Sequence, residues 1–269
     1  MRAVLVERRA RGERSGMEEL AALARTMGYE IVGMLQQVRE PDPAYHIGKG
    51  KAEELADLVR RTGADRVIFG NQLTPSQAYK LSRLVGREVV DRFQLILEIF
   101  AMRASSPEAK LQVEYARLSY ELPRIREQVR EVLSAEQPGL MGGGEYEVNV
   151  YFDMVKRKLA SLRRKLEAIA KDREQRRKLR RRRGFKQVAV AGYTNSGKST
   201  LLNALTSGGA EVDDMYFTTL MPRTRAIRAS KKILLTDTVG FIDGLPPWLV
   251  EAFKATLEEV YASDLVLVL

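Results

Sequence analysis

The chain of 269 residues has no cysteine and a single histidine, and none of its apolar runs is long. Without cysteine there is no disulfide bond, zinc–thiolate site or thiol catalysis, a composition that suits a reducing cytoplasm. We expect no metal or catalytic role for His46, because one histidine in a glycine- and lysine-rich loop cannot build a metal site. No apolar run approaches the ~20 residues that cross a bilayer, and the N-terminus is not a signal peptide. We therefore expect a cytoplasmic protein without stable membrane insertion.

Negative charge is in deficit, since the formal net charge is +10. A basic excess favours polyanionic partners such as RNA or acidic membranes. The alternative is a soluble basic protein without such a partner. The length suffices for about two domains, and a hydrophobic fraction of 45% allows a packed core.

Short apolar runs alternate with helical patterns from residue 1 to about 105. This alternation predicts a parallel sheet with helices packed on it, an N-terminal α/β domain over residues 1–105. The expected strands are Ala3–Val6, Glu30–Met34, Arg66–Gly70 and Glu88–Val90; the expected helices are Met17–Met27 with Ser15 as N-cap, Ala52–Arg61, Pro75–Leu84, and one through Leu95, Ile99 and Met102.

Residues 106–184 carry two heptad seams. Two such helices joined by a glycine-rich loop predict an antiparallel helical arm, with a kink at Pro123 in its first helix. The arm either reaches a partner or is a spacer packed on its neighbours. The seams are Leu111, Tyr115, Leu118, Leu122, Ile125, Val129 and Val132, then Phe152, Val155, Leu159, Leu162, Leu166 and Ile169; the loop between them contains Pro138, Gly139 and Gly142–Gly144.

A basic run, Arg176–Arg183, ends the second helix and is broken only by Leu179. Like charges in a row usually mark a solvated face or a flexible tail. Because this run adjoins the next domain of a basic chain, an RNA contact or an interdomain hinge is an equal alternative.

A phosphate-binding pattern opens the third part of the chain, residues 185–269. The expected buried strand Gln187–Ala191 runs into G-x-x-x-x-G-K-S, the P-loop, and an amphipathic helix follows at Ser199–Leu205. Glycines let the backbone N–H groups curl around the β-phosphate, and the helix directs its positive end at the same anion. The residues expected to bind nucleotide are Gly192, Tyr193, Thr194, Asn195, Ser196, Gly197, Lys198, Ser199 and Thr200.

A second nucleotide-binding element is expected where the strand Lys232–Thr236 ends in Asp237-Thr238-Val239-Gly240. Lys198 is expected to bridge the β- and γ-phosphates, while Ser199 supplies an oxygen to Mg²⁺. Asp237 can hold the same ion through water, and the N–H of Gly240 can approach the γ-phosphate. A threonine of Tyr216–Leu220 could complete the Mg²⁺ shell; the alternative is an ordinary strand-entry pair.

Motifs spread along the chain, among them Ile47–Leu55, Asp91–Ala104 and Asp237–Ile242, resemble those of the HflX family of translational GTPases. In the G domain, Phe217-Thr218-Thr219-Leu220 resembles the family's switch I segment F-A-T-L, and this resemblance places the Mg²⁺ threonine at Thr219. The other matching segments are Ile47–Leu55, similar to I-G-K-G-K-x-E-E-L, Asp91–Ala104, Lys110–Glu114, Leu122-Pro123-Arg124, Asp237–Ile242, which matches D-T-V-G-F-I, and Leu245–Phe253.

The resemblance implies an N-terminal α/β domain with a helical arm, followed by a Ras-like P-loop G domain. It implies GTP hydrolysis with Lys198, Thr219 and Gly240 as catalytic residues and Ser199, Thr219 and Asp237 around Mg²⁺. It also implies binding to the large ribosomal subunit and its RNA, with hydrolysis coupled to release or to subunit separation. Two alternatives stay open: a non-hydrolysing RNA- or ribosome-binding protein, and an ATPase using the same P-loop.

Three features of the sequence depart from these patterns. The arm loop Gly139–Glu145 lacks the T-R-G-P-G-E sequence of many members. No N-K-x-D segment is present, so the choice of guanine rests on the resemblance, and Asp264–Leu269 reads as a fourth strand at which the sequence stops. We therefore expect a piece of a longer protein with an incomplete G domain.

The residue after D-x-x-G is Phe241, where Ras-like enzymes have the glutamine that orients water. We expect slow intrinsic hydrolysis, activated by the ribosome or by a monovalent cation. Asn195 occupies the position at which several GTPases with an apolar residue after D-x-x-G resemble one another in holding K⁺. The alternative is that Asn195 only caps the loop.

Overall fold

The computed structural model describes residues 1–135, 143–207, 216–217, 222–242 and 244–269, without the side chains of 126–148, 231 and 255–256. The chain divides into two compact units. Unit 1 comprises Met1–Ile99 and Glu121–Met154, and unit 2 comprises Phe100–Tyr120 and Val155–Leu269. Each unit contains part of both arm helices, and the three-part division at residues 105 and 184 stays a prediction.

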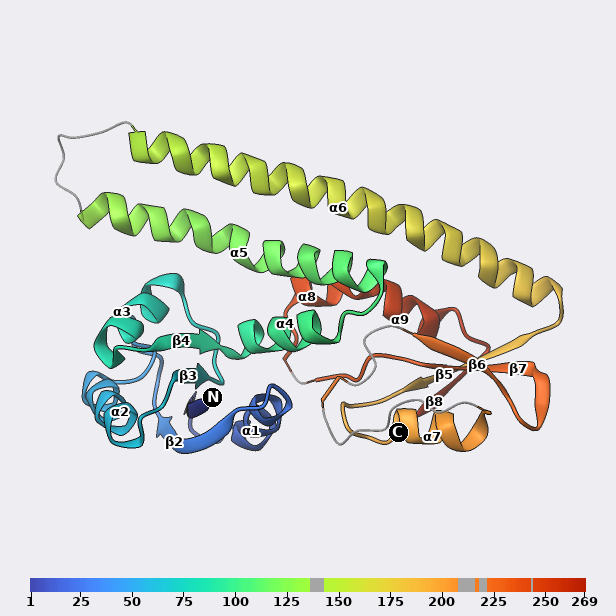
Figure 1. Ribbon diagram of the computed structural model, residues 1–269, viewed down its shortest axis with the longest axis horizontal. Helices are drawn as coiled ribbons and strands as arrows, with labels where there is room; N and C mark the ends of the chain where they lie inside the picture. The colour runs from blue at the N-terminus through green and yellow to red at the C-terminus, as the bar shows by residue number, and fades with distance from the viewer. Residues whose placement is uncertain (136–142, 208–215, 218–221, 243) are drawn as a thin grey trace. The chain divides into compact units, whose positions relative to one another are not determined.

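Unit 1 is built on a four-stranded parallel sheet with the strand order β2-β1-β3-β4 (Figure 1). The α/β prediction is therefore confirmed for this unit. Its strands are β1 (Arg2–Arg9), β2 (Glu30–Val38), β3 (Arg66–Phe69) and β4 (Glu88–Asp91); its first helices are α1 (Met17–Thr26), α2 (Lys49–Thr62) and α3 (Pro75–Val85), and α4 (Arg92–Arg103) continues into unit 2.

The two central strands are the most apolar because a parallel sheet with helices on its faces buries both sides of its strands. Val4 and Val6 of β1 and Val67 and Phe69 of β3 are fully buried, and they share one core with α2 and α3. The strands thus follow from uninterrupted β-branched and aromatic runs rather than from alternation.

The predicted N-cap of α1 is wrong by one residue. Gly16 is the N-cap, and no side chain caps it. The Ser15 hydroxyl donates instead to Glu7 Oε2 at 2.7 Å, although it also accepts from the Met17 N–H at 3.2 Å. The carboxylate of Glu7, buried within β1, is the stronger partner for that hydroxyl.

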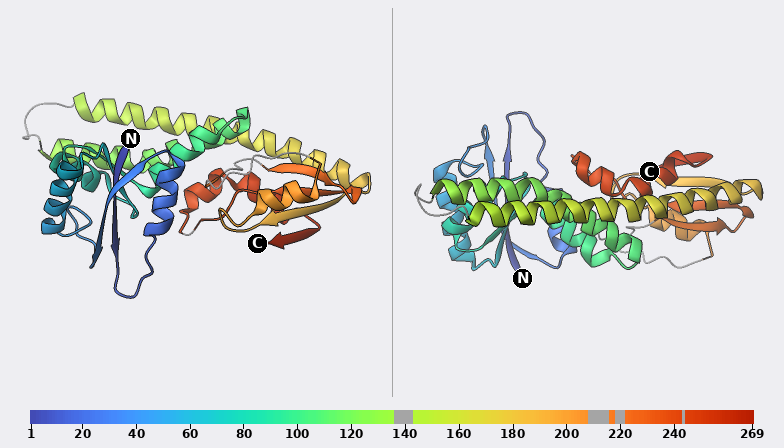
Figure 2. Two further views of the ribbon diagram at one scale, coloured as in Figure 1. Left: turned by 60° about the horizontal axis from the view of Figure 1, so that its bottom comes forward. Right: turned by 90° about the horizontal axis from the view of Figure 1, so that it is seen from above.

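The two long arm helices are present as α5 (Pro107–Ala135) and α6 (Gly143–Arg182). In unit 2, Glu114 of α5 pairs with Lys158 of α6 at 3.0 Å, and Glu108 pairs with Arg173. The residue nearer the start of α5 pairs with the residue nearer the end of α6, so the two helices run antiparallel, as Figure 2 also shows.

The expected loop between the arm helices is only partly described. Residues 136–142 lie outside the described residues, and with them Pro138, Gly139 and most of the divergent stretch Gly139–Glu145. Gly143 and Gly144 were expected in the loop but belong to α6. Pro123 lies inside α5, and a kink there stays a prediction.

Unit 2 contains a second four-stranded sheet with the order β6-β7-β5-β8. Central β5 pairs in parallel with β7 and β8, while the edge strand β6 is antiparallel to β7. β8 confirms the expected fourth strand, whereas β6, α8 and α9 were not predicted. The bounds are β5 (Lys186–Ala191), α7 (Lys198–Leu205), β6 (Arg223–Ile227), β7 (Ser230–Asp237), α8 (Pro247–Ala252), α9 (Lys254–Tyr261) and β8 (Leu265–Val268). Among the described residues, no helix is both long and apolar enough to cross a membrane.

Candidate nucleotide-binding site

The loop between β5 and α7 is curled by its backbone. Asn195 and Gly197 adopt positive φ angles of 62° and 88°, and a Cβ on Gly192 would lie 2.9 Å from Ser196 Oγ. L side chains rarely adopt such φ angles, although asparagine does so more readily than most. The conformation therefore explains the glycines and is compatible with the asparagine.

Lys198 is the first residue of α7, and only 6% of it is exposed. Its ammonium group turns back into the loop, where it donates to the carbonyl oxygen of Tyr193 and, at 3.4 Å, to Ser196 Oγ. Burial lowers the pKa of Lys198, and the negative charge of Asp237 opposes that change. The loop therefore holds a desolvated cation among backbone groups, a suitable arrangement for a phosphate oxygen.

Ser199 and Asp237 are brought together at the end of β7. Parallel pairing places Asp237 opposite Val190 of β5, and the Ser199 hydroxyl donates to Asp237 Oδ2 at 2.7 Å. Asp237 is fully buried, and Thr238 fixes the strand end by donating from Oγ1 to the Val190 carbonyl at 2.7 Å. A hydroxyl and a carboxylate are hard oxygen ligands of the kind that Mg²⁺ binds beside phosphates, so these residues fit that ion.

The segment after Asp237 is bonded to the P-loop through its backbone. Phe241 donates its N–H to the Gly192 carbonyl at 2.9 Å and accepts from the Thr194 N–H at 2.8 Å. A Cβ on Gly240 would lie 2.7 Å from the Thr194 Cα, so no larger residue fits there without movement of the backbone. Sequence reasoning assigned Gly240 to the site but missed this pairing, for which the residue types give no signal.

Other predicted site residues are less closely assembled. Thr219, like Thr218, lies outside the described residues. Tyr193 is 58% exposed, and Thr200 is exposed in the first turn of α7. Val239 is half-buried between Thr238 and Gly240.

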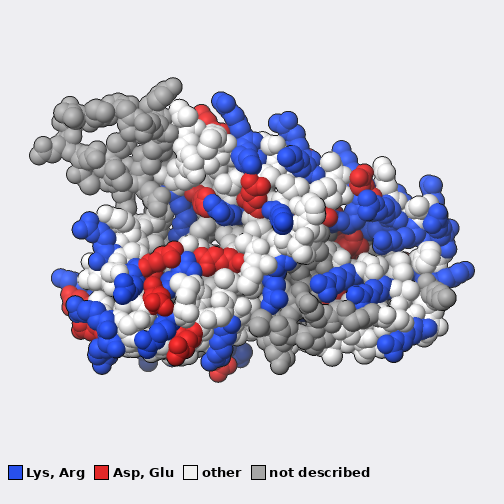
Figure 3. Space-filling model, viewed as in Figure 1, with Lys and Arg blue, Asp and Glu red and all other residues white. Residues whose placement is uncertain are grey.

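The basic run at the end of α6 is divided between two environments. Arg177 donates to Glu259 of α9 at 3.1 Å, with only 11% and 6% of the two side chains exposed, and Arg181 donates to the Ala262 carbonyl. Arg176, by contrast, is exposed, as are Arg182 and Arg183. Figure 3 shows lysine and arginine side chains along α6 and at its C-terminal end. The run is therefore neither wholly a solvated face nor wholly an RNA-facing surface.

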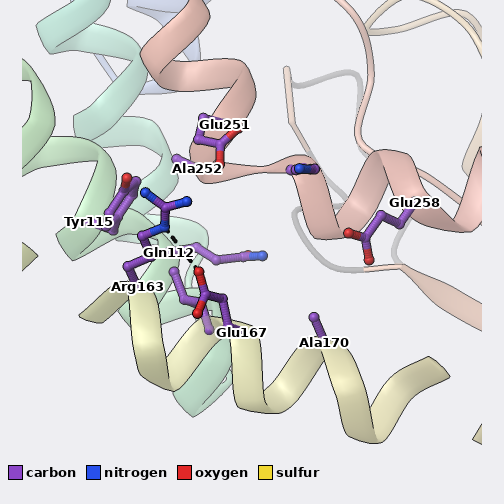
Figure 4. A pocket seen from close by; sticks show the side chains of 10 residues that line it. Gln112, Tyr115, Arg163, Glu167, Ala170, Glu251, Ala252 and Glu258 are labelled. Atoms are coloured by element: carbon purple, nitrogen blue, oxygen red, sulfur yellow. Dashed lines mark hydrogen bonds and ion pairs between the residues drawn. The ribbon is translucent and has the colours of Figure 1, made fainter. Parts of the chain in front are cut away.

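A separate cavity of about 150 Å³ lies in unit 2 among α5, α6, α8 and α9 (Figure 4). Three carboxylates (Glu167, Glu251 and Glu258) and two cations (Arg163 and Lys254) are among its lining groups. The Arg163 Nε atom pairs with Glu167 Oε1 at 3.0 Å. Because the opposing charges nearly balance, the lining does not specify a ligand class.

Three family matches cover most of the chain. Residues 14–101 match the family described as GTP-binding GTPase N-terminal, residues 103–180 its GTP-binding GTPase Middle Region, and residues 187–269 the 50S ribosome-binding GTPase family. Among curated proteins, the chain is 50% identical to GTPase HflX of Thermococcus kodakarensis over 99% of this chain and 61% of that protein. It is 47% identical to GTPase HflX of Methanocaldococcus jannaschii over 98% of this chain and 65% of that protein.

A solved structure agrees over the full chain. The crystal structure of a GTP-binding protein from Sulfolobus solfataricus in complex with GDP matches with a TM-score of 0.53 and 30% identity, covering 100% of this chain and 70% of that one. The chain belongs to the HflX family of GTPases. It spans about three fifths of the length of the curated HflX relatives, 61% and 65% of the two named here. The resemblance seen in the motifs is thereby confirmed, as is the fold class.

Proposed function

We propose that this HflX chain binds GTP with Mg²⁺ at its P-loop and hydrolyses the γ-phosphate bond. The observation that carries the proposal is the meeting of Ser199 and Asp237 at 2.7 Å beside the buried ammonium group of Lys198. The two oxygen ligands come from separate elements, α7 and β7, which pairing of β5 with β7 brings together. Such convergence of a cation with two hard ligands supports a triphosphate–Mg²⁺ site.

In this proposal each residue has a defined role. The N–H groups of the P-loop, residues 192–197, and of α7 hold the β-phosphate. Lys198 neutralises charge between the β- and γ-phosphates, and the Gly240 N–H donates to the γ-phosphate. Ser199, Asp237 and Thr219 would hold Mg²⁺, which supplies charge neutralisation on the transferring group.

We propose that a group other than the side chain at position 241 orients and activates the attacking water. Phe241 neither donates nor accepts through its ring, and its backbone is already bonded to the P-loop. A partner surface acting in trans, or K⁺ held by Asn195, would supply the missing order and charge.

We further propose that the partner is the large ribosomal subunit, with hydrolysis coupled to release or to subunit separation. Two observations support this: residues 187–269 match a family described as 50S ribosome-binding GTPase, and exposed arginines end α6. A polyanionic partner would accept those arginines, since phosphate contacts dominate RNA affinity.

The test measures nucleotide affinity of the full-length protein with Mg²⁺ present. Lys198→Ala is expected to abolish GTP binding, while Lys186→Ala, which removes an equal charge from the exposed start of β5, leaves it unchanged. Equal affinity of the wild type for ATP would favour the ATPase alternative. Ribosome binding without any nucleotide binding would favour the RNA-binding alternative.

A further inference from the structure

Three phenylalanines from distant parts of the sequence form one buried cluster in unit 2. Phe100 of α4 packs edge-to-face on Phe217 and on Phe253, with ring centroids 4.6 Å apart in each pair and interplanar angles of 83° and 65°. The exposed fractions of Phe100, Phe217 and Phe253 are 2%, 4% and 6%. Edge-to-face geometry at this separation is a favourable arrangement of aromatic rings.

The backbone of Phe217 is strained in this position. Its φ angle is 57°, in the left-handed region that bulky residues rarely adopt. Such a conformation persists only when the surroundings over-determine it, and it occurs preferentially at ligand clamps and switch regions. Here the ring of Phe100 packs on the Phe217 side chain, which is only 4% exposed, so packing holds the backbone in place.

The two ring partners of Phe100 both follow the P-loop in the sequence. Phe217 stands two residues before Thr219, the expected Mg²⁺ threonine. Phe253 directly follows α8, the helix that the D-x-x-G segment leads into. One side chain on α4 therefore contacts both the residue two positions before Thr219 and the residue that follows α8.

We propose that Phe100 is a positioning residue for the triphosphate state: by packing on Phe217 it fixes the backbone conformation of that residue before GTP binds. The inference rests on the proposed GTPase function and deepens it. Thr219 itself lies outside the described residues, whereas Phe217 is described. Fixing the backbone of one residue changes an equilibrium about five- to thirty-fold. Without Phe100, Phe217 must be ordered when the triphosphate binds, so the affinity for the triphosphate should fall by a factor of this size.

The test compares affinities for a fluorescent GTPγS and a fluorescent GDP at saturating Mg²⁺, on the full-length protein. Phe100→Ala is expected to weaken GTPγS binding about tenfold and to leave GDP binding within about twofold, because only the γ-phosphate draws on the switch segments. Leu95→Ala is the matched control, since Leu95 is equally buried on the same helix but lies in unit 1. That variant should leave the ratio of the two affinities unchanged.

A double-mutant cycle separates positioning from general destabilisation. Phe217→Ala should reproduce the loss of GTPγS affinity, and the double variant should bind no more weakly than either single variant. Should Phe100→Ala not fold, Phe100→Leu carries the test, because it keeps an apolar side chain but removes the ring; about a threefold loss is then expected.

The outcomes distinguish the two proposals. An unchanged GTPγS to GDP ratio in the position-100 variant, or additive losses in the cycle, would overturn the positioning role alone. A wild-type protein that binds neither nucleotide would overturn the GTPase proposal and the positioning role with it.

Discussion

Arg177→Gln is expected to destabilise unit 2 although it removes one charge from a strongly basic run. The Arg177 guanidinium pairs with Glu259 at 3.1 Å and approaches Glu258 at 3.8 Å. Only 11% of Arg177 and 6% of Glu259 are exposed. The substitution therefore leaves a buried carboxylate without its nearest cation.

The magnitude follows from that burial. Removing one partner of a buried ion pair typically costs about 3–5 kcal/mol. Arg173 reduces this figure, because its charge interacts with both Glu258 and Glu259 and remains in the variant. We expect about 2–3 kcal/mol, the cost of an unsatisfied buried charged group. For a chain of this size that corresponds to a melting temperature lower by roughly 5–10 °C.

Scanning calorimetry measures the effect, and Arg182→Gln is the matched control because it makes the same charge change on an exposed residue of the same run. The control should change the free energy of unfolding by less than about 0.5 kcal/mol. Replacing both partners, as in Arg177→Met with Glu259→Leu, should restore much of the loss. Equal losses for Arg177→Gln and Arg182→Gln would refute the division of the run into structural and exposed arginines.

Three further predictions concern RNA binding, pH and cations. Replacing Arg176, Arg182 and Arg183 with glutamine should flatten the salt dependence of ribosome affinity by about 0.7–0.9 in log–log slope per lost phosphate contact; an unaltered slope, measured by pelleting, would favour a solvated face. Burial, and secondly the charge of Arg8, lower the pKa of His46 from 6.5. The unfolded chain therefore binds a proton more readily than the folded chain, so the contribution of neutral His46 to the free energy of unfolding is fully present above about pH 6.5 and is lost as the pH falls toward the lowered pKa. Urea titrations at several pH values should show a smaller fall for His46→Asn, which tolerates the φ angle of 64°. Hydrolysis by the full-length protein should be faster in K⁺ than in Na⁺, and Asn195→Gly, which suits the φ angle of 62° better than alanine, should abolish the difference; equal wild-type rates would exclude the cation role.

The predictable part of the fold is the part with local signals. The strands of unit 1 are continuous apolar runs, and Gly63 and Gly86 end α2 and α3 with positive φ angles, as helix C-termini favour. The P-loop was predictable in the same way, because Gly192 and Gly197 mark a backbone shape that residue types reveal. Each of these features is decided within about a dozen neighbouring residues.

The elements missed are short and lack periodicity. β6 has the sequence RTRAI with little burial, so neither alternation nor an apolar run marks it. The helices α8 and α9 are six and eight residues long and meet at Phe253, so no helical period extends across them. Contacts between residues far apart in the sequence could not be predicted either, because nothing local marks the pairs Arg177 with Glu259 and Phe100 with Phe217.

Phe241→Gln is not expected to create a fast GTPase, for a reason that the backbone supplies. The N–H and carbonyl of Phe241 both bond to the P-loop, at Gly192 and Thr194, and these bonds fix the direction in which the side chain leaves the main chain. The phenylalanine is 36% exposed in that orientation, so a glutamine side chain at this position would also be partly exposed to solvent. To orient the attacking water, a side chain must come within about 3 Å of it and point toward it. A change of residue type at position 241 achieves neither while the backbone keeps its direction. Single-turnover GTP hydrolysis by the variant, without ribosomes, should therefore stay within about threefold of the wild type. A rise of about a hundredfold, the scale of effective general acid–base assistance, would show that the segment reorients when GTP binds and that the apolar side chain alone limits the intrinsic rate.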